Sequence, residues 1–320
     1  MSKEAIRGAG SRKLAAMTAQ AYYIEGKTKL QIANELGISR FKVARILDNA
    51  RTTGIVTISI HENPSPEMEL AARLRHRFGL MDCIVVAPAD HTSARDQVAR
   101  AGAAFLTNRL SASDVVGLSW GRTLAAMSGF LGGLPPVRAV QLNGFLGDDL
   151  AISPIEILRR VVRRADGEAV PIIAPLLLDS LEAAAAIRRQ PEFSRALEAF
   201  DDLTVACLSL GSWEPRTSQL IDYLAESDRV ALAEAGAVGE LSGIFLDANG
   251  VALEQLANRM IRISIEQLSR APLKVVMAEG ASKGAILLAA IRAQLINAAV
   301  IDSSLAEELL RLAEAQGISL

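Results

Sequence analysis

The feature that most constrains the fold is an alternation of short apolar runs with helix-like stretches, which begins after residue 80. Apolar runs without a polar face, separated by helices, are typical of a parallel sheet that is covered on both sides. The sequence therefore predicts a doubly wound, mostly parallel α/β domain over residues 81–320. The strand candidates are residues 83–87, 114–120, 138–144, 169–175, 203–211, 243–247, 273–280 and 298–302.

The length of 320 residues predicts two domains. No run of 18 uncharged apolar residues is present, so no membrane span is expected. Residues 1–17 lack the apolar segment of a secretory signal. We therefore expect a cytoplasmic protein.

The cysteines and histidines do not form a pattern of metal ligands. Cys83 and Cys207 lie in apolar strand-like runs, which favours reduced, buried thiols over a disulfide. His61, His76 and His91 are not paired with cysteines or carboxylates at the spacing of a metal site. No metal and no cofactor are expected.

Charge is distributed unevenly along the chain. Residues 1–60 hold ten Lys or Arg against four Asp or Glu, whereas residues 61–320 hold 24 against 32. Five of the seven lysines precede residue 43. A small basic segment on an acidic body indicates that this segment meets a polyanion.

Residues 33–46, ANELGISRFKVARI, have the spacing of a helix-turn-helix. Ala33 is small enough for the helices to cross closely, Gly37 permits the turn, Ser39 can cap the next helix and Val43 packs inward. The apolar faces of the two preceding helices are expected to include Met17 and Leu30, respectively. The alternating residues 55–60 could form the wing of a winged helix-turn-helix.

These features predict a winged helix-turn-helix DNA-binding domain over residues 1–60. The alternative is an ordinary three-helix bundle with a solvated basic face. Candidate contacts to operator DNA are Thr28, Ser39, Arg40, Lys42 and Arg45.

A linker and a connecting helix are expected over residues 61–80, because two prolines precede an amphipathic pattern. Leu70, Leu74 and Phe78 share one face of this helix. It could connect the domains or help to form a dimer.

Four strand candidates end in glycine and polar residues, in the loops 118–123, 142–147, 208–213 and 278–285. Sheets of this kind bind ligands beyond the carboxyl ends of their strands, and helix starts there favour anions. Arg122 and Lys283 each stand beside such a glycine. One polar ligand, phosphorylated or not, is therefore predicted, although each glycine alone is compatible with a routine turn.

The motifs GLSWGRTL, VQLNG, LAEAGAVGELSGIFLDANG and the tail that starts MAEGASKGAILLAAIR resemble the SorC type of bacterial transcriptional regulator, to which DeoR-like kin belong. The resemblance runs from about residue 12 to residue 316. It implies a winged helix-turn-helix joined to an effector domain with the fold of sugar-phosphate isomerases and glucosamine-6-phosphate deaminase. It also implies operator DNA, a sugar or sugar-phosphate effector, and a homodimer or homotetramer.

The resemblance also implies a set of effector contacts, with the first and last loops at the phosphate end and Asp247 at the sugar hydroxyls. The set comprises Ser119, Gly121, Arg122, Thr123, Asn143, Gly144, Gly211, Asp247, Glu279, Gly280 and Lys283.

Glu279 departs from the family pattern, which commonly has a glycine there. A carboxylate near an anion site repels a phosphate by about 1 kcal/mol or more. Glu279 could point away, pair with Lys283, or mark a neutral sugar or polyol as the ligand. A Schiff base is not expected, because no lysine lies between residues 43 and 273.

The predicted function is a DNA-binding transcriptional regulator, with repression favoured by family habit, of a carbohydrate or polyol catabolic operon. The alternative is a sugar-phosphate isomerase or deaminase-like enzyme on the same fold. A third hypothesis is a structural role, in which the acidic body, residues 61–320, serves only to dimerise the basic N-terminal segment.

Overall fold

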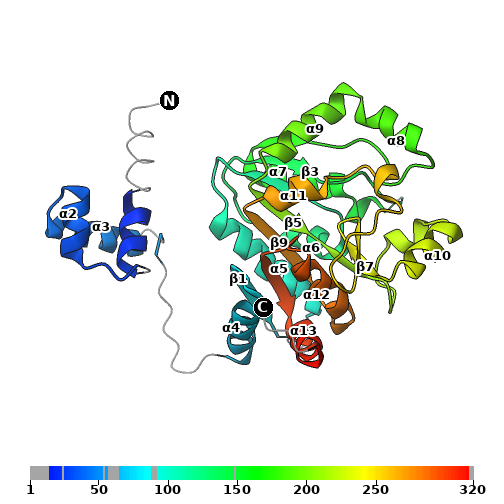
Figure 1. The fold of residues 1–320 in the computed structure, drawn as a ribbon. Helices are drawn as coiled ribbons and strands as arrows, with labels where there is room; N and C mark the ends of the chain where they lie inside the picture. The colour runs from blue at the N-terminus through cyan, green and yellow to red at the C-terminus, as the bar shows by residue number, and fades with distance from the viewer. Residues whose placement is uncertain are drawn as a thin grey trace. The chain divides into compact units, whose positions relative to one another are not determined.

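The computed structural model describes residues 14–23, 25–52, 55–56, 65–87, 92–147 and 149–316. The chain divides into two compact units, residues 1–63 and residues 64–320 (Figure 1). Among the described residues, no helix is long and apolar enough to cross a membrane.

The first unit contains a helix over residues 14–23, α2 (Lys29–Leu36) and α3 (Arg40–Thr52). Thr28 caps α2, because its Oγ1 accepts a hydrogen bond from the Gln31 N–H at 3.3 Å. Gly37 ends α2 in the left-handed conformation, at φ 63°, and the Ser39 Oγ accepts from the Lys42 N–H at 3.2 Å. The predicted turn between the two helices is thus present.

The core of the first unit combines small residues of its first two helices with one large residue, Ile32 of α2. Ala15, Ala19 and Ala33 are buried there with Val43 and Leu47 of α3. The predicted faces of the first two helices were wrong at their large residues, since Met17 is 53% exposed and Leu30 is 61% exposed. On α2 the inward-facing residues are Ile32 and Ala33, so the face that packs is displaced from the predicted one and Leu30 turns outward. Most of the predicted wing, residues 57–60, lies outside the described residues.

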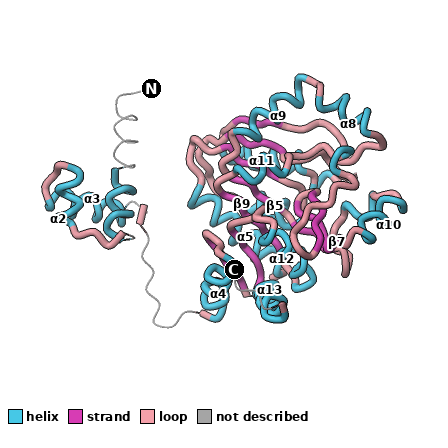
Figure 2. Tube along the Cα trace, viewed as in Figure 1, coloured by secondary structure: helices cyan, strands magenta, loops and turns pink. Residues whose placement is uncertain are grey.

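The second unit is built on two sheets, which appear as the magenta strands in Figure 2. Within the described residues, seven parallel strands pair in the order β1-β10-β9-β5-β2-β3-β4, and an antiparallel sheet follows the order β6-β7-β8. The strands are β1 (Asp82–Val86), β2 (Val115–Leu118), β3 (Arg138–Gln141), β4 (Glu168–Val170), β5 (Val205–Leu208), β6 (Leu210–Ser212), β7 (Ala237–Leu241), β8 (Ile244–Asp247), β9 (Leu273–Ala278) and β10 (Ala298–Asp302).

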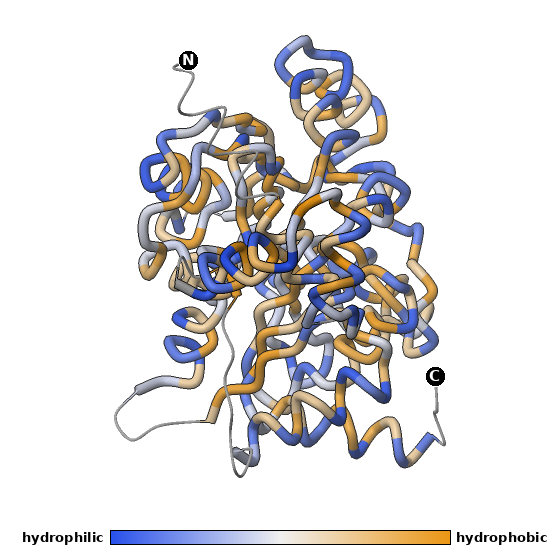
Figure 3. Tube along the Cα trace, turned by 90° about the vertical axis from the view of Figure 1, so that its left-hand side faces the viewer, coloured by the Kyte–Doolittle hydropathy of each residue, from blue (hydrophilic) through white to orange (hydrophobic). Residues whose placement is uncertain are grey.

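Helices cover both faces of the parallel sheet, as predicted. Val275 and Met277 of β9 pack with the helices α5, α6 and α7, whereas Val276 and Ala278 pack with α4, α9, α11, α12 and α13. Figure 3 shows the same pattern as apolar strands inside and polar turns outside. The helices are α4 (Pro66–Phe78), α5 (Ala94–Arg109), α6 (Arg122–Phe130), α7 (Pro154–Ala165), α8 (Leu181–Arg188), α9 (Pro191–Asp201), α10 (Glu226–Glu234), α11 (Ile265–Arg270), α12 (Gly284–Arg292) and α13 (Ser303–Ala315).

Two strand predictions needed correction. The apolar run 203–211 forms two strands in different sheets, β5 and β6, because the chain leaves the parallel sheet at Ser209. Strand β7 was missed, since AVGEL carries a glycine and a glutamate where a strand pattern is expected. The predicted face of α4 is present, with Leu74 and Phe78 buried and Leu70 partly buried.

The strand order places a topological switch point between β2 and β5. From β2 the chain builds outward through β3 and β4, and from β5 it builds the other way through β9 and β10. In open parallel sheets the helices on the two sides leave a crevice at this point, outside the carboxyl ends of the strands. A ligand site is therefore expected beyond Leu118 and Leu208.

Both thiols are buried in the second unit. Cys83 lies in β1 and Cys207 in β5. Burial raises the pKa of each thiol to about 12. Both cysteines therefore act as small apolar core residues.

Replacing Leu305 with Ala should lower the free energy of unfolding of the second unit by about 2–5 kcal/mol, because this buried leucine of α13 leaves a cavity. Urea denaturation followed by circular dichroism measures the change. The matched control is Leu181→Ala on α8, whose side chain is 54% exposed and whose loss should change stability by less than about 0.5 kcal/mol. Equal losses in both variants would contradict the packing described.

Candidate functional site

The first unit presents a basic surface at the start of α3. Arg40, Lys42 and Arg45 are exposed, and Val43 between them is buried. The Arg40 guanidinium lies 5.1 Å from the ring centre of Phe41, which is 71% exposed. This helix end thus offers cations and one aromatic ring to a partner.

Thr28 and Ser39 differ from these cations, because their hydroxyls already serve as helix caps. The Thr28 Oγ1 also donates to the Gln31 Oε1 at 2.9 Å. A contact of either residue with DNA would have to coexist with its cap.

In the second unit, a pocket lies at the switch point, at the carboxyl ends of β2, β5 and β9. Its lining includes six of the residues predicted from the sequence, namely Gly121, Arg122, Thr123, Gly211, Glu279 and Lys283. Three of the four predicted loops therefore meet, and we call this the Glu279–Lys283 pocket. Its free volume is about 30 Å³, enough for one or two water molecules.

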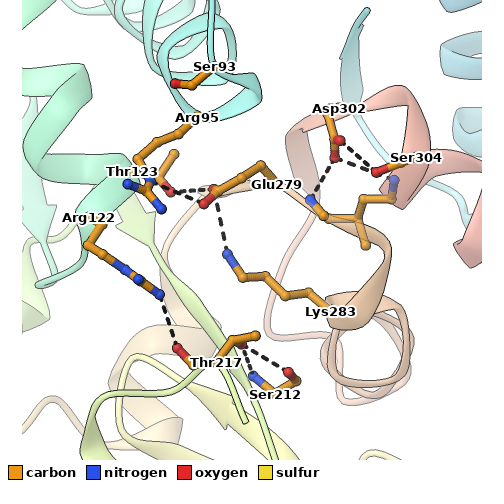
Figure 4. Close-up of polar contacts among 12 residues, drawn as sticks. Ser93, Arg95, Arg122, Thr123, Ser212, Thr217, Glu279, Lys283, Asp302 and Ser304 are labelled. Carbon is orange, nitrogen blue, oxygen red and sulfur yellow. Dashed lines mark hydrogen bonds and ion pairs between the residues drawn. The ribbon is translucent and has the colours of Figure 1, made fainter. Parts of the chain in front are cut away.

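Glu279 is the centre of the polar contacts in this pocket (Figure 4). Its Oε1 accepts a hydrogen bond from the Arg95 Nε at 3.2 Å. Its Oε2 accepts from the Thr123 Oγ1 at 2.6 Å and lies 3.5 Å from the Lys283 Nζ. One carboxylate thus joins α5, α6 and the turn before α12.

Asp302, the last residue of β10, fixes the turn that carries Lys283. The Gly280 N–H donates to the Asp302 Oδ1 at 2.9 Å, and the Ser304 hydroxyl donates to Oδ2 at 2.6 Å. Gly280 has φ 92°, a conformation that favours glycine. Lys283 therefore lies directly before the first residue of α12, where it is buried.

The surroundings of Lys283 and Glu279 lower the pKa of both side chains. Burial lowers the pKa of Lys283 more than Glu279 raises it. Burial would raise the pKa of Glu279, but Lys283, Thr123 and Arg95 together lower it. Glu279 is therefore ionised at neutral pH.

Arg122 lies at the exposed mouth of the pocket. Its Nη2 donates to the Thr217 backbone oxygen at 3.3 Å, and no carboxylate among the described residues pairs with it. Gly121 precedes it with φ 137° and provides no side-chain cap for α6. The first residues of α6 thus line the pocket without a side-chain cap on their N–H groups, beside a guanidinium that keeps free donors.

Glu240 of β7 also lines the pocket, although the sequence did not identify it. Its Oε1 accepts from the Ser218 hydroxyl at 2.9 Å and its Oε2 from the Gly243 N–H at 2.8 Å. Burial raises the pKa of Glu240 to about 7, against the lowering effects of these bonds and of Lys283. A charged residue within an apolar, glycine-containing run was the signal available in the sequence.

The second predicted loop does not reach the lining of this pocket. Asn143 is buried, and its Nδ2 donates to the Ser119 Oγ at 3.1 Å and to the Ser242 oxygen at 3.2 Å. A Cβ at Gly144 would lie 2.5 Å from the Ala174 oxygen, so this glycine allows close backbone packing. Ser119, Asn143 and Gly144 thus lie behind the pocket.

Asp247 is placed elsewhere than expected. Its Oδ1 accepts hydrogen bonds from the N–H groups of Asn249 at 2.9 Å and Val251 at 2.8 Å, so it closes the turn after β8. It is absent from the lining of the pocket. The local turn, whose N–H groups need an acceptor, holds this carboxylate.

No group of three or more metal-ligating side chains occurs among the described residues. The described histidine, His76, is exposed on α4.

The second unit is thus an α/β domain with a candidate ligand pocket at its switch point, and the first unit has two helices joined by the predicted turn. The profile of the family described as "Putative sugar-binding domain" matches residues 62–311, and the chain belongs to this family.

Known relatives agree with this assignment. The chain is 28% identical to the transcriptional regulator LsrR of Enterobacter sp., over 94% of each chain. It is 28% identical to the sorbitol operon regulator of Klebsiella pneumoniae, over 93% of this chain and 98% of that one. The crystal structure of the full-length sorbitol operon regulator SorC from Klebsiella pneumoniae superposes with a TM-score of 0.72 at 26% identity, covering 93% of this chain and 99% of that chain. The resemblance to SorC-type regulators and the predicted fold class are confirmed.

Replacing Glu240 with Gln should change how stability depends on pH. The folded protein binds a proton at Glu240 up to about pH 7, whereas an unfolded carboxyl releases it near its ordinary value of 4.5. The wild-type free energy of unfolding therefore falls as pH rises between these values, by about 3 kcal/mol at about 1.4 kcal/mol per pKa unit. The variant should lack this contribution.

Urea denaturation of both proteins at about pH 5 and about pH 8 measures the difference. The exposed Glu198→Gln serves as the control. If Glu240→Gln and the wild type keep a constant difference across this range, Glu240 does not retain its proton in the fold.

Proposed function

We propose that the chain is a sequence-specific DNA-binding transcriptional regulator controlled by a small sugar, polyol or sugar phosphate that binds in the Glu279–Lys283 pocket. The observation that carries the proposal is the convergence of three glycine loops, two cations and the start of α6 on one pocket, in a chain with a basic helix-turn-helix. The relatives, named as regulators, support it. A regulator of this kind would act on DNA in the cytoplasm.

The contacts of Glu279 favour a phosphorylated ligand. Both of its oxygens are already bonded, so its charge is balanced within the protein by Lys283 and Arg95. Arg122 then remains as a cation without a carboxylate partner, beside the N–H groups of α6. Cations and helix N–H groups bind phosphate oxygens well. A neutral sugar would instead have to compete with Arg95 and Thr123 for Glu279.

The small free volume of the pocket supports a change of conformation on binding. A sugar phosphate does not fit within about 30 Å³, so side chains or loops must move to admit it. The effector would then select the open arrangement and shift its population. A coupled change in the arrangement of subunits, in a homodimer or homotetramer, would alter DNA affinity. From the family resemblance alone, we further propose that the protein represses transcription.

An enzymatic function is less well supported than control of transcription. A carboxyl with a pKa of about 7, such as Glu240, has the proton affinity of a general base. Its two oxygens, however, are engaged by Ser218 and the Gly243 N–H. The basic helix-turn-helix and the regulators among the relatives both favour control of transcription.

The ligand class can be tested by thermal shift with sugars, polyols and their phosphates. A phosphorylated compound should raise the melting temperature of the wild type. Lys283→Met should remove that rise, because Glu279 then lacks the ammonium that neutralises it and repels the anion. Lys274→Met is the matched control, since the Lys274 ammonium donates to Ser269 and Ala271 backbone oxygens outside the pocket. A rise with a neutral polyol that survives in Lys283→Met would contradict phosphate recognition.

The DNA contacts can be tested on a fragment that the protein selects from a random-sequence pool. Arg40→Ala should weaken binding by about 1–3 kcal/mol if the guanidinium reads a base edge. Arg45→Ala should reduce the slope of log affinity against log salt by about 1 if it neutralises a phosphate. Fluorescence anisotropy at several salt concentrations measures both.

Lys27→Ala is the control for these variants, because its ammonium lies 2.9 Å from Glu35 and is already paired. Unchanged affinity in Arg40→Ala together with an unchanged slope in Arg45→Ala would reject α3 as the DNA-reading helix.

A further inference from the structure

A second cavity, of about 390 Å³, lies between α9, the start of α11 and the segment 254–264. It shares no lining residue with the Glu279–Lys283 pocket. Ligand sites commonly have volumes of about 300–1,000 Å³, so this cavity can admit a small molecule without rearrangement. Since Arg188 and Arg262 both line it, we call it the arginine pocket.

Arg262 carries a charge that the fold does not neutralise. Its Nη1 donates to the Ile263 backbone oxygen at 2.9 Å, but its Nε is buried and has no acceptor. Among the described residues, no carboxylate lies within 4.0 Å of its guanidinium, and Glu254 acts on it only at longer range. Burial lowers the pKa of Arg262 to about 10, and the charge of Arg188 lowers it further. Arg262 is thus a largely enclosed cation without an ionic partner, and such a cation destabilises a fold unless a ligand supplies the anion.

Arg188 adds a second guanidinium to the same cavity. It donates to the backbone oxygens of Asn258 at 3.0 Å and Met260 at 2.7 Å, which fixes it beside the wall formed by the segment 254–264. Burial lowers the pKa of Arg188 as well. Glu254 also lines the cavity, but neither guanidinium has a carboxylate within 4.0 Å among the described residues. The two cations against one distant carboxylate leave an excess of positive charge, which indicates an anionic ligand.

The remaining walls define the rest of that ligand. Phe193 and Leu197 of α9 face Ile263 and Ile265 across the cavity. These side chains would cover an apolar body, and a guanidinium binds a carboxylate with two parallel hydrogen bonds. We propose that the arginine pocket binds a small organic carboxylate with an apolar or aromatic body, as a second ligand site separate from the Glu279–Lys283 pocket.

The two pockets share one structural element, the turn at Gly243. A Cβ at Gly243 would lie 3.3 Å from Trp120, which lines the first pocket, and 3.2 Å and 3.6 Å from Met260 and Arg262, which line the second. The Gly243 N–H also holds Glu240 in the first pocket. The Gly243 turn thus lies next to residues of both pockets.

The test uses benzoate as the probe and benzyl alcohol as its uncharged counterpart, on the full chain. Millimolar benzoate should raise the melting temperature of the wild type by several degrees at constant ionic strength, and benzyl alcohol should not. Arg262→Met should abolish the rise, whereas Lys283→Met should retain it. A benzoate rise that persists in Lys283→Met would show that benzoate binds outside the Glu279–Lys283 pocket. This holds whether or not a sugar binds in that pocket.

The melting temperature of Arg262→Met without ligand provides a second readout. Because an unpaired buried charge is removed, it should equal or exceed that of the wild type, whereas a merely structural arginine would leave it lower. If this variant does not fold, Leu197→Phe, which fills the cavity from α9, should abolish the benzoate rise instead. A benzoate rise that persists in Arg262→Met or in Leu197→Phe, or a wild type that does not respond, would overturn the proposal.

Discussion

A parallel sheet that is buried on both faces confines polar chemistry to the ends of its strands. The central strands β2, β5 and β9 are buried along their whole length, and their alternate residues meet helices on opposite sides. Lys274 in β9 is consistent with this constraint, since its ammonium leaves the sheet to reach the backbone oxygens of Ser269 and Ala271. The Glu279–Lys283 pocket lies where three of these strand ends meet a change in winding direction.

At that point one carboxylate organises the surroundings. Glu279 engages groups from α5, α6 and the turn before α12, and these groups lie far apart in the sequence. The carboxylate of Glu279 is therefore satisfied without a ligand, and the free volume beside it is small. A ligand that enters must offer more than the contacts it displaces, which makes binding sensitive to the exact set of acceptors it carries. The arginine pocket differs, because its volume is larger and the Nε of Arg262 has no acceptor there.

Sequence patterns predicted the layers of the fold and six of the residues that line the pocket, for identifiable reasons. Apolar runs mark buried strands regardless of partners, and a cation beside a strand-end glycine, such as Lys283, predicts a polar site at that strand end. Glu240 was missed because it belongs to an antiparallel strand whose pairing is non-local, and its burial follows from that pairing. Asp247 was misplaced because a motif does not show which local N–H groups its carboxylate binds. In the first unit, Met17 and Leu30 face outward because Ala15 and Ala19 occupy the contacts of the first helix, and Ile32 and Ala33 those of α2.

The burial of Cys83 and Cys207 has a consequence for how this chain can be studied. A thiol with a pKa of about 12 has almost no thiolate at neutral pH, and the thiolate is the form that alkylating reagents and oxidants attack. The native cysteines should therefore react very slowly with maleimides while the chain remains folded. A single cysteine introduced on the surface of each unit would carry a fluorophore without removal of the native pair. The distance between the two units could then be followed directly as ligands are added.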